Sequence, residues 1–211
     1  MRSERKSEQL PLMDSVARTV RATVARKPTR SFIGSTNFSG SSRAIECELS
    51  RLAAKGELAH VRTGLYWKGP KTMLGMGRPH PLDVALRVGG PGTGPAGFSA
   101  AAMLGLTTQV PATIEVAVPG WLPTPPAGVR FTRRHRSRRE FRLKPAEVAL
   151  LEVLRDWPLT VESSWDDLVA RARELIADSI IRPSAVTKEV EAAHRRAARD
   201  AWYRLKSDLA I

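Results

Sequence analysis

The stretch Ser41–Trp67 constrains the fold of this chain most strongly, because it predicts a helix, a sharp stop and a hairpin in succession. It opens with two serines, and a serine hydroxyl can accept a backbone N–H of the first helical turn. Apolar residues then recur at helical spacing, and Gly56 stands where a left-handed residue would end the helix. Two short apolar segments flank a Thr63-Gly64 turn, which is typical of a hairpin. Helix, glycine and hairpin in this order form the last part of a winged helix-turn-helix.

The predicted helix has one apolar side and one side of small or basic residues. With a rotation of about 100° per residue, the apolar stripe contains Ile45, Leu49, Leu52 and Ala53, and the opposite side contains Arg43, Ala44, Cys47, Ser50, Arg51 and Ala54. Glu46 and Glu48 are expected on the flanks. A helix in the major groove needs small residues for close approach, and hydroxyls and arginines that bond base edges and phosphates. An ordinary solvated helix face would have a similar composition.

We therefore predict a DNA-contacting surface on this helix and hairpin. Its residues are Ser41, Ser42, Arg43, Cys47, Ser50 and Arg51 on the helix, and Arg62 and Thr63 beside the hairpin turn. Cys47 is the only cysteine of the chain, which excludes an intrachain disulfide and agrees with a reducing cytoplasm. A redox role for Cys47 is an alternative, although a lone cysteine is usually just a small residue.

The net charge of +13 is concentrated in two places. Residues 1–68 carry 13 Lys or Arg against 6 Asp or Glu, and residues 130–142 carry 7 against 1. This distribution suits a polyanionic partner. We predict that the second place is a further phosphate contact, the alternative being a solvated loop; its residues are Arg133, Arg134, Arg136, Arg138 and Arg139.

Hydrophobic patterning predicts an α+β chain of two domains. The first, residues 1–68, is the winged helix-turn-helix, with a helix capped by Asp14, a strand at 30–33 and a short second helix expected in a segment rich in Gly, Ser and Asn. The second, residues 69–211, is a small mixed α/β domain with a helical C-terminal part. It begins with a linker rich in Gly and Pro.

The elements expected in the second domain are helices, two strands and then helices again. A helix at 82–88 and one at 99–104, capped by Ser99 and stopped by Gly105, precede strands at 113–118 and 129–132. Three helices complete the chain, at 145–156, 165–177 and 183 to about 205.

No catalytic, metal or cofactor site is predicted. His60, His80, His135 and His194 are scattered, without the spacing of metal ligands. The glycine-rich loop at 89–97 lacks the Gly-Lys-Ser/Thr of a phosphate loop. An endonuclease-like enzyme would need Glu/Asp-x-Lys on a strand to hold a metal, and the only such triplet is Glu4-Arg5-Lys6. No apolar run is long enough to span a membrane, so we expect a cytoplasmic protein.

Three segments resemble the AbiEi family of antitoxins from type IV toxin–antitoxin systems. They are RAIECELSRLAAKGELAHVRTGLYW, GFSAAAMLGLTTQVP, and IEVAVPG followed by VRFTRR. They are similar to the recognition helix and wing, to a helix and turn, and to a strand pair of that family. The second segment is the most specific, because winged helices are common.

The resemblance implies a transcriptional autorepressor that binds inverted repeats in double-stranded DNA upstream of its own operon. It also implies opposition to a nucleotidyltransferase-like toxin, without a stable complex, and DNA contacts at Ser42, Arg43, Ser50, Arg51 and Arg62. Two alternatives stay open: a stand-alone winged-helix regulator with a ligand- or dimer-forming C-terminal domain, and an endonuclease-like DNA-processing enzyme.

Overall fold

The computed structural model describes residues 9–211, with side chains from Val16 onward, and shows a mixed α+β chain. The chain divides into two compact units, one ending at His80 and the other beginning at Pro81. Residues 69–80, which the sequence assigned to the second domain, thus group with the first unit. Within the described residues, no helix is both long and apolar enough to cross a membrane.

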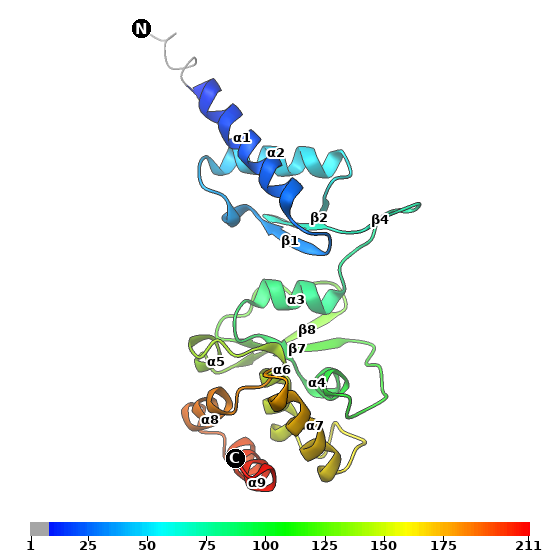
Figure 1. Cartoon of the computed structure of the whole chain (residues 1–211), viewed down its shortest axis with the longest axis vertical. Coiled ribbons are helices and arrows are strands. Elements are labelled where there is room, and N and C mark those ends of the chain that lie inside the picture. The colour runs from blue at the N-terminus through cyan, green and yellow to red at the C-terminus, as the bar shows by residue number, and fades with distance from the viewer. Residues whose placement is uncertain (1–8) are drawn as a thin grey trace. The chain divides into compact units, whose positions relative to one another are not determined.

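The first unit has the element order of a winged helix (Figure 1). Its elements are α1 (Gln9–Arg26), β1 (Ser31–Gly34), the 3-10 helix η2 (Ser35–Asn37), α2 (Ser42–Ala54), β2 (Ala59–Arg62) and β3 (Leu65–Lys68). The three strands form an antiparallel sheet in the order β1-β3-β2. Helix α1 begins before Asp14, so Asp14 is not the N-cap that we predicted.

The second helix expected in the winged helix is reduced to the single turn η2. There the Asn37 side chain accepts a hydrogen bond from the Gly34 N–H at 2.8 Å. Glycine, serine and asparagine favour such local turns over a longer helix. Helix α2 is held instead by an apolar core formed by its own Ile45, Leu49 and Leu52 with Val20, Val24, Ile33, Leu58 and Tyr66.

The expected linker after Lys68 contains a small hairpin, formed by β4 (Lys71–Thr72) and β5 (Gly75–Met76). The Trp67 indole N–H donates to the Gly77 carbonyl at 2.9 Å, which fixes the hairpin to the end of β3. A side chain at Gly69 would collide with that same carbonyl oxygen, so the close approach requires glycine. A hairpin of two short strands, anchored by Trp67, therefore stands where composition predicted a linker.

The second unit is built on a three-stranded sheet in the order β6-β7-β8. Strand β6 (Gly94–Pro95) is antiparallel to β7 (Ile114–Pro119), and β7 is parallel to β8 (Val129–Arg134), which confirms the two predicted strands. Helix α3 (Pro81–Gly89) lies on one face, and α4 (Gly97–Leu104) and α6 (Pro145–Arg155) lie on the other (Figure 1). Gly105 ends α4 in a left-handed conformation with φ 74°, as predicted. Ser99 is not its cap; its hydroxyl is buried inside α4 and accepts the Glu115 N–H.

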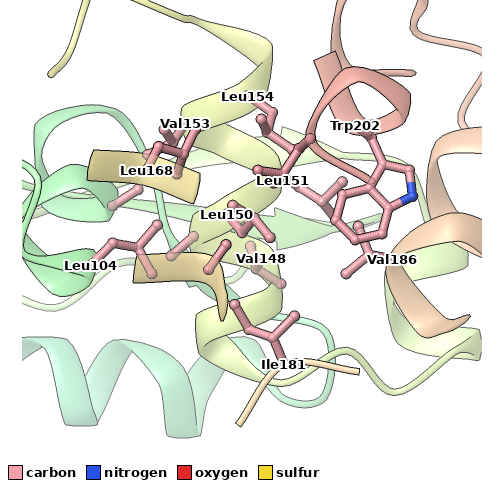
Figure 2. Close-up of a cluster of buried hydrophobic side chains, with 14 of the residues drawn as sticks. Leu104, Val148, Leu150, Leu151, Val153, Leu154, Leu168, Ile181, Val186 and Trp202 are labelled. Carbon is pink, nitrogen blue, oxygen red and sulfur yellow. The ribbon is translucent and has the colours of Figure 1, made fainter. Parts of the chain in front are cut away.

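Helix α6 forms the centre of the larger core. Figure 2 shows its leucines and valines between Leu104 of α4 and Trp202 of α9. The surrounding helices are α5 (Ser137–Glu140), α7 (Trp165–Ala177), α8 (Pro183–Ala192) and α9 (Arg196–Leu209).

The single helix predicted from 183 to about 205 is wrong, because the chain breaks at His194, which has φ 51°. The break rotates α9 so that Trp202 and Leu205 are fully buried, instead of Ala197 and Ala201, which an unbroken helix would place in line with Val186 and Val190. The Trp202 indole N–H then donates to Thr187 of α8 at 3.0 Å. Burial of a tryptophan and a leucine outweighs continuation of the alanine pattern.

Candidate nucleic-acid interface

The exposed side of α2 carries the residues predicted to contact DNA. Ser41 is the N-cap, and its hydroxyl accepts the Ala44 N–H at 3.4 Å. The exposed residues of this side are Ser41, Ser42, Arg43, Cys47, Ser50 and Arg51. They form a continuous helical surface of hydroxyls, one thiol and two guanidinium groups.

Arg43 is the arginine of this surface whose side chain is bonded to no described residue. It is exposed, in the first turn after the N-cap, and makes no hydrogen bond or ion pair with the described part of the chain. Its neighbour Ala44 was expected on the same side but is only 5% exposed, so the surface is narrower than the sequence predicted. All five N–H donors of Arg43 remain available to a ligand.

Arg51 is held by a buried carboxylate. Glu48, expected on a flank, is 2% exposed and belongs to the buried side of α2. It accepts hydrogen bonds from Arg51 Nη1 at 2.6 Å and from Arg21 Nη1 of α1 at 3.1 Å. The Arg51 side chain is still 55% exposed, so the ion pair orients its guanidinium and leaves further donors facing outward.

Tyr66 connects the hairpin to α2. Its ring is buried, and its hydroxyl lies 3.1 Å from Ser50 Oγ and donates to a Glu46 carboxylate oxygen at 3.3 Å. The His60 ring packs edge-on against it, with 5.3 Å between centroids. These contacts fix the hydroxyl of Ser50 relative to strands β2 and β3. Sequence patterning did not identify Arg21, Glu46 or Tyr66 as supports of the surface.

The turn of the hairpin places two further predicted residues at its tip. Arg62 and Thr63 are both exposed, and Gly64 has φ 73°, which favours glycine. The Gly64 carbonyl accepts the Ser35 N–H at 3.0 Å, so the turn is tied to η2. The wing is therefore a short, fixed turn with one cation beside it.

Two arginines of the run 133–139 contradict the prediction of a phosphate contact, because they lie in the interior of the second unit. The Arg134 side chain is 13% exposed and that of Arg138 is 7% exposed. Arg134 donates to both oxygens of Glu152 on α6, with Nη2 at 2.6 Å from Oε2. Arg138 Nη1 lies 2.7 Å from Glu152 Oε1, and its Nε donates to Glu189 at 3.3 Å.

The remaining arginines of the run are exposed, and the run is not a loop but the end of β8 and the short helix α5. Arg136 forms a long ion pair with Glu140 at 3.6 Å, and Arg139 donates to the Gly89 carbonyl at 3.1 Å. Arg133 has no side-chain partner among the described residues. Arg133, Arg136 and Arg139 keep the phosphate-contact prediction open.

Glu152 is a fully buried carboxylate with three arginine neighbours, the third being Arg155 at 3.2 Å. Burial acts to raise the pKa of Glu152, but the hydrogen bonds from Arg134 and the charges of Arg138, Arg134 and Arg155 together lower it below its usual value. Glu152 is therefore ionised at neutral pH and neutralises the interior arginines.

The described residues offer no metal-binding arrangement. They contain no group of three His, Cys, Asp or Glu side chains able to hold a metal ion. Ser137 lies between His135 Nδ1, at 2.6 Å, and Glu189, but its hydroxyl is buried and donates to the carboxylate. In a nucleophilic triad the carboxylate is hydrogen-bonded to the histidine and not to the serine. The Glu4-Arg5-Lys6 triplet lies outside the described residues.

No protein-family model matches the sequence, and no curated protein matches it either. Among solved structures the chain is similar to the RV2827C protein from Mycobacterium tuberculosis, with 19% identity and a TM-score of 0.43 over 92% of this chain and 80% of that one. At this TM-score the similarity carries no argument about function.

Proposed function

We propose that this chain is a sequence-specific DNA-binding transcriptional autorepressor and the antitoxin of a type IV toxin–antitoxin system. The observation that supports the DNA-binding half is the exposed side of α2, where Arg43 and Arg51 stand among small hydroxylated residues beside a fixed wing. A winged helix inserts such a helix in the major groove and its wing beside the backbone.

The two arginines have different roles in this proposal. Arg43 has a free planar fork, which suits bidentate bonding to the O6 and N7 atoms of a guanine. Arg51 is already oriented by Glu48, which suits a phosphate oxygen at a defined position. Ser42, Ser50, Arg62 and Thr63 would complete the contacts to the sugar-phosphate backbone.

The antitoxin half of the proposal rests on the resemblance of the segment at 97–111. In the structure, that segment is α4, its glycine stop and a turn organised by Glu162. The Glu162 carboxylate accepts hydrogen bonds from the Thr108 N–H, the Gln109 amide and both threonine hydroxyls, which lowers its pKa to about 2. The turn thus has a fixed shape at neutral pH.

The DNA partner in this proposal is a set of inverted repeats upstream of the protein's own operon. The functional partner is a nucleotidyltransferase-like toxin that forms no stable complex with the protein. The protein would act in the cytoplasm, without a cofactor and without enzymatic activity. The second candidate is a stand-alone winged-helix regulator whose second unit binds a ligand, and a pocket in that unit favours it.

The DNA-binding proposal is tested by fluorescence anisotropy on a duplex from just upstream of the gene. A scrambled duplex of equal length and composition is the control, and both are titrated over a salt series. Preference for the native duplex at every salt concentration supports an autorepressor. Equal binding to both, driven by salt alone, would reduce α2 to a basic surface.

The antitoxin proposal has a separate test in cells. A gene next to this one that encodes a nucleotidyltransferase-like protein is expressed with and without this chain. Rescue of growth by the chain is expected, also when the operon's own promoter is replaced by an unrelated one. If growth is never inhibited or never rescued, the second candidate is preferred.

A further inference from the structure

The second unit contains a pocket with a volume of 410 Å³, lined by residues of β8, α5, α6, α8 and α9. Five arginines contribute to its lining, and they are Arg133, Arg134, Arg138, Arg155 and Arg195. Arginines around one cavity repel one another unless negative charges compensate them. The protein supplies only part of that compensation.

Three of the arginines pair with three nearby carboxylates. Arg134 and Arg138 share the buried Glu152, Arg138 also pairs with Glu189, and Arg155 bonds Asp156 at 2.6 Å as well as Glu152. Arg133 and Arg195 have exposed side chains and no partner for them among the described residues. The pocket therefore has two cations at its mouth whose charge the described protein does not neutralise.

Glu189 is a carboxyl group in the lining, and it pairs with Arg138 rather than with Arg133 or Arg195. Both of its oxygens are used within the protein, one by the Ser137 hydroxyl and the other by Arg138 Nε. Its burial also raises its pKa, although the Ser137 and Arg138 bonds act in the opposite direction. An anion in the pocket would thus face arginine donors and a carboxyl group that is already bonded.

The first turn of α9 adds a second feature that favours an anion. Arg195 is the N-cap of this 14-residue helix and makes no capping hydrogen bond with its side chain. Ala198, in the first turn, lines the pocket, so the positive end of the helix dipole lies at its wall. Helix N-termini bind phosphate groups through their N–H groups and dipole.

The pocket also has an apolar wall. Leu151, Val190, Ala193 and Ala198 line the same cavity. A pocket of several hundred cubic ångströms with apolar walls and a few converging polar groups is typical of a small-molecule site. The ligand must therefore combine an anionic group with an apolar or aromatic part.

From this arrangement we propose that the pocket binds a nucleoside phosphate, with its phosphate held by Arg133, Arg195 and the first turn of α9, and its base or sugar on the Leu151–Val190 wall. The guanidinium groups of Arg134 and Arg138 are only 13% and 7% exposed and are paired with Glu152 and Glu189, so they are not available to a DNA backbone. The inference does not depend on the proposed DNA-binding function, because every residue of the pocket lies in the second unit.

Isothermal titration calorimetry of the full chain tests this site. The probes are the four ribonucleoside monophosphates, their four nucleosides and inorganic phosphate. At least one nucleotide should bind, and at least tenfold more tightly than both its nucleoside and inorganic phosphate, because the two halves of the site act together. Failure of all four nucleotides to bind overturns the proposal.

Variants separate this site from general attraction to a basic protein. Arg133→Ala/Arg195→Ala should weaken nucleotide binding about tenfold or more, as expected for two lost charge-assisted contacts. The control Arg87→Ala/Lys188→Ala removes the same charge from exposed positions outside the lining, and should leave the affinity within about twofold.

Three outcomes contradict the assignment of the site. Equal weakening by both double variants would show a nonspecific electrostatic effect. Weakening by neither, with binding retained, would place the nucleotide elsewhere on the chain. A short scrambled duplex is also added to the nucleotide-bound protein, with addition of buffer alone as the control. Displacement by the duplex and not by the buffer would show that the cavity region is a nucleic-acid surface instead.

Discussion

Two arginine-rich stretches of this chain have similar composition and different structural roles. On α2, Arg43 and Arg51 are exposed beside small polar residues. In the run 133–139, Arg138 is buried, Arg134 is largely buried, and both are neutralised by Glu152 and Glu189. The difference arises from carboxylates that lie far along the chain from the second stretch, on α6 and α8. A local excess of positive charge therefore does not by itself locate a DNA-binding surface.

The largest effect is expected from removal of the buried carboxylate. Glu152→Ala leaves Arg134 and Arg138 charged in the interior without their main partner, and should lower the free energy of unfolding by about 3–5 kcal/mol. Urea unfolding followed by tryptophan fluorescence measures it. The control Glu140→Ala removes an exposed ion-pair partner of Arg136 and should cost less than about 0.5 kcal/mol. Similar costs for both variants would show that the interior cluster has no structural role.

Arg51 links the two kinds of arginine, because it is exposed and also bonded to a buried carboxylate. Arg51→Ala should weaken specific DNA binding by about 1–3 kcal/mol and also lower the free energy of unfolding by about 1 kcal/mol, since Glu48 keeps only Arg21. Arg43→Ala, which loses no partner among the described residues, is the matched control for stability. If Arg51→Ala leaves DNA binding intact and only destabilises, then Arg51 is structural.

Acidification should destabilise the second unit through its buried carboxylates. Hydrogen bonds from Arg182 and Lys144 lower the pKa of Glu147 despite its burial, and those from Arg134 lower that of Glu152. Both groups bind protons more tightly in the unfolded chain, so their stabilisation is present above the ordinary value of 4.5 and is lost as the pH falls below it. Glu189, whose pKa is raised, contributes in the opposite direction.

Urea unfolding at a series of pH values measures this dependence. Glu147→Gln should reduce the loss of stability on acidification, although the variant is less stable at neutral pH. Glu140→Gln, at an exposed position, is its control. A stability that rises steadily on acidification would contradict the assignment of Glu147 and Glu152 as ionised groups.

The smallest effect is expected from the exposed arginines of the run. Arg136→Ala/Arg139→Ala should lower the affinity for native and scrambled DNA alike, and reduce the slope of log affinity against log salt by about 1–2. Fluorescence anisotropy over a salt series gives the slope. An unchanged slope would show that this run does not contact DNA. The arginines of α2 and those of the run would then differ completely in role.

Local sequence signals predicted much of this structure. Ser41, Gly56, Gly64 and Gly105 stand at the cap, stop and turn positions where the sequence placed them, because each position requires a particular backbone conformation or a side-chain acceptor. The strands at 114–119 and 129–134 were likewise evident from their β-branched and apolar residues.

Features that depend on tertiary contacts were not predictable. The break at His194 follows from burial of Trp202 against α8, and the hairpin at 71–76 from the bond between Trp67 and Gly77. The inward position of Glu48 depends on Arg21 of another helix. In the site, exposure of Arg43 could be predicted from helical periodicity, whereas the supports of Arg51 and Ser50 could not.

The most direct test of the proposed role of α2 is the preference of three proteins for the native upstream duplex over its scrambled control, measured by fluorescence anisotropy at one salt concentration. The proteins are the wild type, Arg43→Ala, and Arg18→Ala, which removes an equal charge from an exposed position of α1. We predict that the preference falls by about 1–3 kcal/mol in Arg43→Ala and is unchanged in Arg18→Ala. No preference in the wild type, or an equal loss in both variants, would contradict sequence-specific binding by this helix.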